Sequence, residues 1–203
     1  MLPWASGGQV NPDDDQGVKV RLFVAINPPE RVRERIGAGT EDLRSLEGIR
    51  WVAPDRVHLT LKFLGEVEEE SERSIAEALG RVAMGRGPFE ARVTAPGAFP
   101  NIRRPRIIWL GLDRSPELAA LQRDLEDALA DLGFEREERE FRPHLTLGRV
   151  RRGRRVDGSV LDSLVRRTEV PGAWQVEAVD LMRSHLLPTG AVHEVRASAE
   201  LTG

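Results

Sequence analysis

Apolar and polar residues alternate along the chain in a pattern that predicts short strands interspersed with helices. Strand-type runs cover residues 21–26, 49–52, 58–64, 89–99, 106–112, 144–150, 174–183 and 191–199. Apolar residues at helical spacing follow Pro29 as far as Leu46, and they recur over 71–84, 115–133 and 159–168. Short strands of alternating polarity between amphipathic helices favour an antiparallel α+β fold over a doubly wound parallel sheet.

The same order of elements occurs twice. His58 follows Arg21, at the start of the first strand, by 37 positions, and His144 follows Arg106 by 38 positions. The next long strand begins 31 positions after His58 and 30 positions after His144. Equal spacing of unlike elements indicates an internal duplication. We therefore expect two β-α-β-α-β lobes related by a pseudo-twofold axis, with antiparallel sheets flanking a central cleft.

The two lobes are expected to form one domain over residues 18–203. Lobe one covers about 18–100 and lobe two about 106–203, with the break in the turn-forming residues 101–105. Residues 1–17 contain Gly, Pro and three consecutive Asp, and they lack the basic start and apolar centre of a signal peptide. This composition predicts a disordered leader.

The composition is that of an ordinary soluble protein. Hydrophobic residues make up 40% and charged residues 31%, and the net charge of −3 gives no overall attraction to nucleic acid or an anionic membrane. The absence of cysteine excludes disulfides, thiolate catalysis and cysteine-ligated zinc. No apolar run approaches the roughly 18 residues that span a bilayer. We expect a cytoplasmic monomer without membrane contact or an implied protein partner, in which any RNA binds through a local patch.

The candidate chemistry lies in the tetrapeptide His-Leu-Thr-Leu, which occurs at 58–61 and again at 144–147. Side chains alternate between the two faces of a strand, so the histidine and threonine of each copy face one way and the leucines face the other. The leucines are expected to bury each strand on a core. A pseudo-twofold axis would then bring His58, Thr60, His144 and Thr146 to one cleft.

Two histidines and two hydroxyls suit the opening of a cyclic phosphodiester. That reaction needs a base to deprotonate water and an acid to protonate the departing ribose oxygen, and histidine, with an ordinary pKa near about 6.5, can take either role. Hydroxyl groups can hold the non-bridging phosphate oxygens as charge develops. A single motif of this kind is more often structural. Two copies at equivalent points of a repeat indicate a function.

Longer stretches around these motifs carry a resemblance to a known family. They are RLFVAINPP, RWVAPDRVHLTLKFLGEV, FPNIRRPRIIWLGL, FRPHLTLGRV and LMRSHLLPTGAVHEV, and the resemblance extends from Arg21 to about Leu201. In them the chain resembles the 2H phosphoesterase superfamily, which is defined by paired His-x-Thr-x motifs. The flanking residues are similar to its RNA 2′,3′-cyclic phosphodiesterase branch, also called 2′-5′ RNA ligases.

The resemblance implies an activity and a role for each motif residue. The activity is hydrolysis of a terminal 2′,3′-cyclic phosphate on RNA to a 2′-phosphate, without a metal or another cofactor and with 2′-5′ ligation as its reverse. His58 is implied to be the general acid and His144 the general base, and Thr60 and Thr146 are implied to contact phosphate. Arg149, five residues after the second histidine, matches an arginine of the family.

Other functions use the same residues. A metallohydrolase is one, although no HxH, HExxH or Asp-rich cluster accompanies the two histidines. A non-catalytic module that binds RNA ends is another, although it would not require both histidines. A phosphodiesterase acting on a different cyclic nucleotide or on a 2′-5′ linkage is a third.

Several features keep two interpretations each. The arginine-rich run 151–155 fits a solvated loop or phosphate steering, and the smaller cluster at 103–106 favours a solvated surface. Phe63 fits a core position or a ring that stacks on a base. His185 and His193 are more typical of structural or surface residues, and relatives in the family usually carry Tyr at the position of His193.

Overall fold

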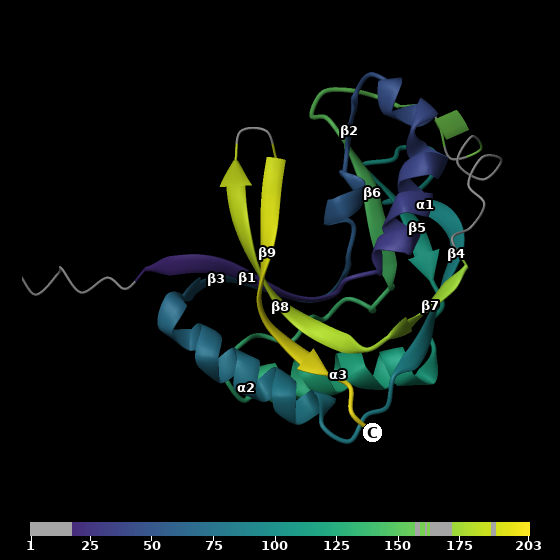
Figure 1. Cartoon of the computed structure of the whole chain (residues 1–203). Coiled ribbons are helices and arrows are strands. Elements are labelled where there is room, and N and C mark those ends of the chain that lie inside the picture. Colours follow the sequence, from purple (N-terminus) through teal and green to yellow (C-terminus); the bar gives the residue numbers. More distant parts are fainter. Residues whose placement is uncertain (1–17, 157–158, 161, 163–171, 188–189) are drawn as a thin grey trace, which may run out of the picture.

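The computed structural model describes residues 18–156, 159–160, 162, 172–187 and 190–203, which form a curled antiparallel sheet with helices packed around it (Figure 1). The strands are β1 (Lys19–Ile26), β2 (Ile49–Trp51), β3 (Leu59–Glu68), β4 (Phe89–Phe99), β5 (Ile107–Leu112), β6 (His144–Val150), β7 (Ala173–Val176), β8 (Ala178–Leu187) and β9 (Gly190–Glu200). Their order in the sheet is β7-β4-β5-β6-β3-β1-β8-β9, and β2 pairs with β6 outside this path. The predicted antiparallel α+β fold is confirmed.

Each predicted strand segment falls on strand structure, with one difference. The run 174–183, expected as a single strand, is divided at Glu177 into β7 and β8. β7 pairs with β4, whereas β8 pairs with β1 and β9. One segment of alternating polarity therefore pairs with two distant parts of the sheet, and its alternation alone could not show this.

Strands from the two halves of the sequence interleave across the sheet. β1 lies between β3 and β8, and β4 lies between β5 and β7. Each end of the sheet therefore combines strands from both halves of the chain. The division into lobes at about 18–100 and 106–203 stays a prediction. The leader at 1–17 and most of the predicted helix 159–168 lie outside the described residues.

The helices α2 (Glu72–Ala83) and α3 (Pro116–Ala130) pack against each other below the sheet in Figure 1. α2 also contacts β8 and β9, and α3 contacts β3 and β4. Ser115 caps α3, because its hydroxyl accepts a hydrogen bond of 3.2 Å from the backbone N–H of Leu118. The buried stripe of α3 consists of Leu118, Leu121, Leu125 and Leu129. In the described part of the chain, no helix is both long and apolar enough to cross a membrane.

The first helix, α1 (Glu30–Thr40), is shorter than the apolar spacing predicted. It ends at Thr40, and a short 3-10 turn at Asp42–Ser45 follows, which leaves Leu46 38% exposed. Gly37 is required by packing, because a Cβ there would lie 2.9 Å from Cγ of Pro54. Pro54 belongs to the 3-10 turn η2 (Pro54–Arg56), which leads directly into the first motif.

Candidate active site

The two His-Leu-Thr-Leu segments lie side by side at the centre of the sheet. β3 and β6 pair antiparallel with Leu59 opposite Leu145, which are 1% and 0% exposed. The second leucine of each motif is also buried, at 4% for Leu61 and 1% for Leu147. The leucines therefore anchor both motifs in the core, as predicted, and leave the histidines and threonines on the other face.

The four polar motif residues share this opposite face, which we call the motif face. The two strands pair at Leu59 and Leu145, and side chains alternate along each strand, so the histidine and threonine of both motifs lie on the face opposite these leucines. All four residues are partly exposed. His144 begins β6, whereas His58 lies just before β3 and follows the turn η2. Among the described residues, neither threonine hydroxyl has a hydrogen-bond partner, so both are available to a ligand.

Each motif histidine is held by the carbonyl oxygen two residues before it. Nδ1 of His58 lies 2.9 Å from the carbonyl oxygen of Arg56, and Nδ1 of His144 lies 2.7 Å from that of Arg142. A carbonyl oxygen only accepts hydrogen bonds, so Nδ1 carries a proton in both rings. Nε2 is then the free base of the neutral ring and the second acid of the protonated ring. Both histidines therefore offer Nε2 for proton transfer.

The two histidines also pack against rings supplied by the other half of the chain. His193 on β9 meets His58 edge-on, with centroids 5.2 Å apart and planes at 86°. Phe99 at the end of β4 meets His144 in the same way, at 5.0 Å and 85°. Each imidazole is therefore packed against a ring from the other half of the chain, which holds it between elements that are distant in the sequence.

A second ring on each side repeats with the internal duplication. Phe23 lies with its centroid 4.9 Å from His58, and Trp109 lies 6.0 Å from His144. Each of these rings precedes its histidine by 35 positions. Gly97 on β4 makes room for Trp109, because a Cβ at Gly97 would collide with the indole ring. The indole can therefore lie across the sheet and support His144.

Arg149 reaches the motif face through a β-bulge. It stands five positions after His144, an odd number that would turn it to the opposite face in a regular strand. The register between β5 and β6 shifts between Ile108 and Trp109, so that Leu147 has no residue opposite it and the alternation resets. The positive charge of Arg149 lowers the pKa of both motif histidines.

Phe63 stands in the equivalent position after His58. The register between β1 and β3 shifts between Val24 and Ala25, and beyond that shift Phe63 lies opposite Phe23. Its ring centroid is 6.1 Å from that of Phe23, and the residue is 71% exposed. Phe63 is therefore not a core residue, and it extends the ring cluster around His58 to the surface.

The same register shift turns Lys62 into the core. Its ammonium lies 2.5 Å from Oε2 of Glu126 on α3 and donates a hydrogen bond of 2.7 Å to the carbonyl oxygen of Glu135. The side chains of Lys62 and Glu126 are 4% and 9% exposed. This buried ion pair fixes β3 to α3 directly behind the first motif.

Burial depresses the basicity of both motif histidines. Burial is the largest cause, and together with the charges of His193, Arg149 and His144 it lowers the pKa of His58 to about 4, against the raising effect of the Arg56 carbonyl. Burial also lowers the pKa of His144, which the Arg142 carbonyl partly offsets. Both rings are therefore neutral at pH 7 in the free protein. A bound anion would favour their protonated forms and raise both pKa values.

The sequence relationships of the chain agree with this geometry. A sequence profile of the 2′-5′ RNA ligase superfamily matches residues 28–186. The chain belongs to that superfamily. It is 36% identical over 178 residues to the RNA 2′,3′-cyclic phosphodiesterase of Methanothermobacter thermautotrophicus, a match that covers 87% of this chain and 96% of that protein. The protein of the same name from Archaeoglobus fulgidus is 36% identical over 177 residues, covering 86% and 97%.

Solved structures of the superfamily have the same fold. TT0787 of Thermus thermophilus superposes with a TM-score of 0.76 at 30% identity, covering 90% of this chain and 98% of that one. LigT of E. coli, complexed with 3′-AMP, superposes with a TM-score of 0.71 at 28% identity, covering 92% and 100%. The predicted family is thus confirmed by both sequence and fold.

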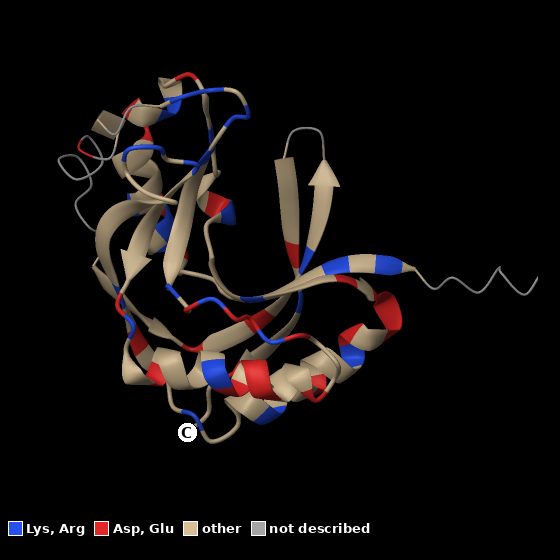
Figure 2. Ribbon diagram, turned by 180° about the vertical axis from the view of Figure 1, so that it is seen from behind, with Lys and Arg blue, Asp and Glu red and all other residues tan. Residues whose placement is uncertain are grey.

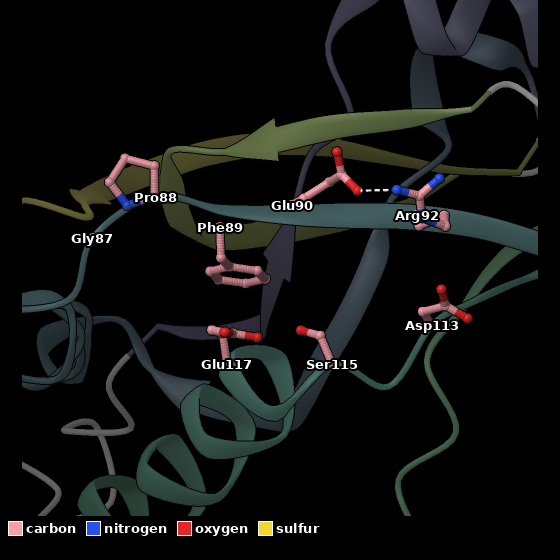
Figure 3. A pocket seen from close by; sticks show the side chains of 8 residues that line it. All are labelled: Gly87, Pro88, Phe89, Glu90, Arg92, Asp113, Ser115 and Glu117. Carbon is pink, nitrogen blue, oxygen red and sulfur yellow. Dashed lines mark hydrogen bonds and ion pairs between the residues drawn. The ribbon is translucent and has the colours of Figure 1, made fainter.

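A hollow away from the motif face is less suited to a phosphate ester. Figure 3 shows a hollow between the start of β4 and the N-terminus of α3, in which Glu90, Asp113 and Glu117 are accompanied by Arg92 as the one cation. Arg92 is already paired with Glu90. An excess of carboxylates repels an anionic substrate. Within the described ranges, no three His, Cys, Asp or Glu side chains gather where they could hold a metal ion.

His193 is the site residue that sequence reasoning missed. It lies opposite Ser184 in the β8–β9 hairpin, and its ring packs against both His58 and Phe23. Its place beside His58 depends on β8 pairing with β1, a contact between residues more than 150 positions apart. The difference from the Tyr expected in relatives was the one available signal. His185, by contrast, pairs with Glu194 at 3.3 Å and stays outside the ring cluster.

Proposed function

We propose that this protein is an RNA 2′,3′-cyclic phosphodiesterase, which hydrolyses a terminal 2′,3′-cyclic phosphate to a 2′-phosphate by acid–base catalysis with His58 and His144. The observation that carries the proposal is the matched pair of imidazoles on neighbouring strands, each with Nδ1 bound to a carbonyl oxygen and Nε2 free. The names of the relatives in the superfamily support the same reaction.

The proposed reaction has two proton transfers, one from water to His144 and one from His58 to the leaving oxygen. Nε2 of His144 accepts a proton from water as the water oxygen bonds to phosphorus. The bond between phosphorus and the ribose 3′ oxygen breaks, and Nε2–H of His58 protonates that oxygen. Phosphorus keeps its bond to the 2′ oxygen, so the product is a 2′-phosphate. The assignment of acid to His58 and base to His144 follows the family resemblance.

Thr60, Thr146 and Arg149 are proposed to hold the phosphate. Both hydroxyls lie on the motif face with the histidines, and the Arg149 guanidinium acts on both rings. Hydroxyl and guanidinium donors can offset charge on the non-bridging oxygens as the pentavalent transition state forms. The anion also raises the pKa of His58, which provides the protonated acid that the free protein lacks at neutral pH.

Three further properties belong to the same proposal. A 5′-hydroxyl of RNA in place of water would give a 2′-5′ phosphodiester by the same proton transfers, so we include ligation as a secondary activity. We also propose that the protein acts as a monomer, since a single chain supplies both histidines. Its proposed location is the cytoplasm.

The test is incubation of the protein with RNA that ends in a 2′,3′-cyclic phosphate, in the presence of excess EDTA, followed by identification of the product isomer. Conversion to a 2′-phosphate supports the proposal. A requirement for a divalent metal, or formation of a 3′-phosphate, would contradict it. A metallohydrolase would lose activity in EDTA, and a non-catalytic binding module would leave the RNA intact.

A further inference from the structure

A pair of arginines lies side by side where β2 joins β6. Arg50 stands directly opposite Arg149 in the antiparallel register. Residues opposed in this way project from the same face, with Cβ atoms about 4.5–5.5 Å apart, and like charges in such a pair destabilise a sheet. Both residues are exposed, and neither guanidinium has a carboxylate partner among the described residues. The pair therefore has a cost in the free protein that a bound anion would offset.

More unpaired arginines continue from this pair around the same end of the sheet. The backbone N–H of Val150 donates to the carbonyl oxygen of Arg106, and that of Arg151 donates to the carbonyl oxygen of Gly48. The first bond joins the loop after β4 to the end of β6, and the second joins the start of the loop after β6 to the residue before β2. The loops after β4 and after β6 carry blue segments at the same end of the molecule in Figure 2. We call this group the distal arginines: Arg50, Arg103, Arg104, Arg106, Arg151 and Arg154.

The loop after β4 is held in a defined conformation. Oδ1 of Asn101 accepts hydrogen bonds from the backbone N–H groups of Arg103 and Arg104, at 3.1 and 3.0 Å. The two guanidinium groups remain exposed and without a carboxylate partner in the described ranges. The turn therefore presents positive charge at a fixed place.

Arginines elsewhere in the molecule are more often paired with acidic residues. Arg183 contacts Glu69 at 2.7 Å and Arg196 contacts Glu72 at 2.9 Å, and Arg86 is paired with Asp124. The chain as a whole has a net charge of −3. An unpaired basic surface at this end of the sheet is therefore a local feature, which general surface composition does not explain.

We propose that the distal arginines bind the phosphates of the RNA strand that leads up to the cyclic end, so that the protein selects RNA termini over cyclic mononucleotides. In this proposal Arg149 binds the scissile phosphate, and Arg50 beside it binds the phosphate that precedes it in the RNA strand. The inference rests on the proposed function for its choice of RNA. It replaces the expectation that the cluster at 103–106 is merely solvated.

The first test measures binding of the full chain to a short single-stranded RNA with a 3′-phosphate, over a range of salt concentrations. Each phosphate contact contributes about −0.7 to the slope of log affinity against log salt. Replacing Arg103, Arg104 and Arg106 together by Gln should flatten the slope by about 2. Arg50→Gln alone should weaken binding about five-fold at 0.1 M salt.

The matched control carries the same charge change on the helices α2 and α3. It replaces Arg73, Arg81 and Arg123 by Gln, all of which are exposed. This variant should keep the slope of the unaltered protein. Equal slopes for both triple variants would show that only overall charge matters, and would overturn the proposal. Loss of binding to anionic vesicles but not to RNA in the distal variant would indicate a membrane surface instead.

The second test compares kcat/KM for a cyclic mononucleotide and for a short RNA with the same cyclic terminal nucleotide. The unaltered protein should favour the RNA by on the order of ten-fold, and the ratio should fall towards one in the distal triple variant. A ratio that does not change would contradict the inference while leaving the proposed function intact. If neither substrate reacts, the proposed function fails, and the salt dependence of binding still decides the inference.

Thermal unfolding of the free protein gives an independent readout. Arg50→Gln removes one of two opposed like charges, so its Tm should rise by roughly 1–2 °C while its RNA binding falls. A structural role for Arg50 predicts the reverse change in Tm. A lower Tm with unchanged RNA binding would overturn its assignment to the RNA surface.

Discussion

His193 meets the ring of His58 edge-on at a centroid distance of 5.2 Å, so a third titratable ring adjoins the proposed general acid. A positive charge on His193, like that of Arg149 or His144, lowers the pKa of His58. Burial lowers the pKa of His193 itself, as do the charges of Arg56 and His185. The proton affinity of His58 therefore depends on groups from both halves of the chain.

The pH dependence of kcat/KM should lie at lower pH than that of kcat. kcat/KM follows the free protein, in which the pKa of His58 is about 4 and that of His144 is below its usual value. The proposed roles require His58 protonated and His144 neutral, so kcat/KM should peak below pH 6.5 and fall towards alkaline pH. The bound anion raises both pKa values, so kcat should peak at higher pH.

Steady-state kinetics across pH 4–9 measure both profiles. In His193→Phe, the loss of the neighbouring charge should raise the pKa of His58 and so move the acid limb of kcat/KM to higher pH. Coincident profiles for kcat/KM and kcat, or a limb that does not move in this variant, would contradict the charge coupling. The two limbs belong to the interacting histidines together and need not each report one residue.

The stability of the folded protein should fall as the solution becomes acidic, partly because of His58. Its pKa is lower in the folded state than the roughly 6.5 of an unfolded histidine, so the unfolded chain binds more protons between these values. Its contribution is present above pH 6.5 and is lost as the pH falls towards 4, by up to about 3 kcal/mol. Urea unfolding at pH 7 and pH 4.5 should show a smaller difference in His58→Gln. An unchanged difference would contradict the lowered pKa.

The buried ion pair behind the first motif should be sensitive to the loss of one partner. Lys62→Met leaves the carboxylate of Glu126 buried without its cation and should lower the free energy of unfolding by about 3–5 kcal/mol. Replacing both residues by Met should recover most of that loss. The control is Arg73→Met, whose exposed pair with Glu77 should contribute no more than about 0.5 kcal/mol. A double variant as unstable as Lys62→Met would argue against the ion pair.

Gly97→Ala should disturb the packing of Trp109 beside His144. The new Cβ collides with the Trp109 indole, so the ring must move away from its place beside His144. We expect a loss of about 1–3 kcal/mol in unfolding free energy together with a fall in kcat/KM. Gly80→Ala is the control, because its Cβ would meet nothing within 4 Å in α2 and should stabilise the helix by about 0.5–1 kcal/mol. Normal kinetics in Gly97→Ala would show that Trp109 does not support catalysis.

The sequence was sufficient to predict the strands and the motif pair because both depend on local alternation. The buried leucines on either side of Thr60 and Thr146 follow from a period of two, and the repeat then relates the two copies. The bulges could not be predicted, because they break that alternation. Arg149 and Phe63 reach the motif face only through a shift of register. A regular strand would have placed both on the core side.

Contacts between distant strands were also beyond sequence reasoning. The division of 174–183 at Glu177 sends β8 to pair with β1, and this pairing brings His193 to His58. The spacing of apolar residues records which face of a strand is buried but not which strand lies beside it. For the same reason, the exchange of His193 and Phe99 between the two motif histidines became visible only in the fold.

The most direct test of the central claim is kcat/KM for His58→Ala, His144→Ala and the double variant, measured on RNA with a 2′,3′-cyclic end in excess EDTA. Each single variant should lose about 10²–10⁴-fold, the usual effect of removing a general acid or base. The double variant should lose much less than the product of the two, because both residues act in one transition state. A single variant that keeps nearly full activity would contradict catalysis by the histidine pair.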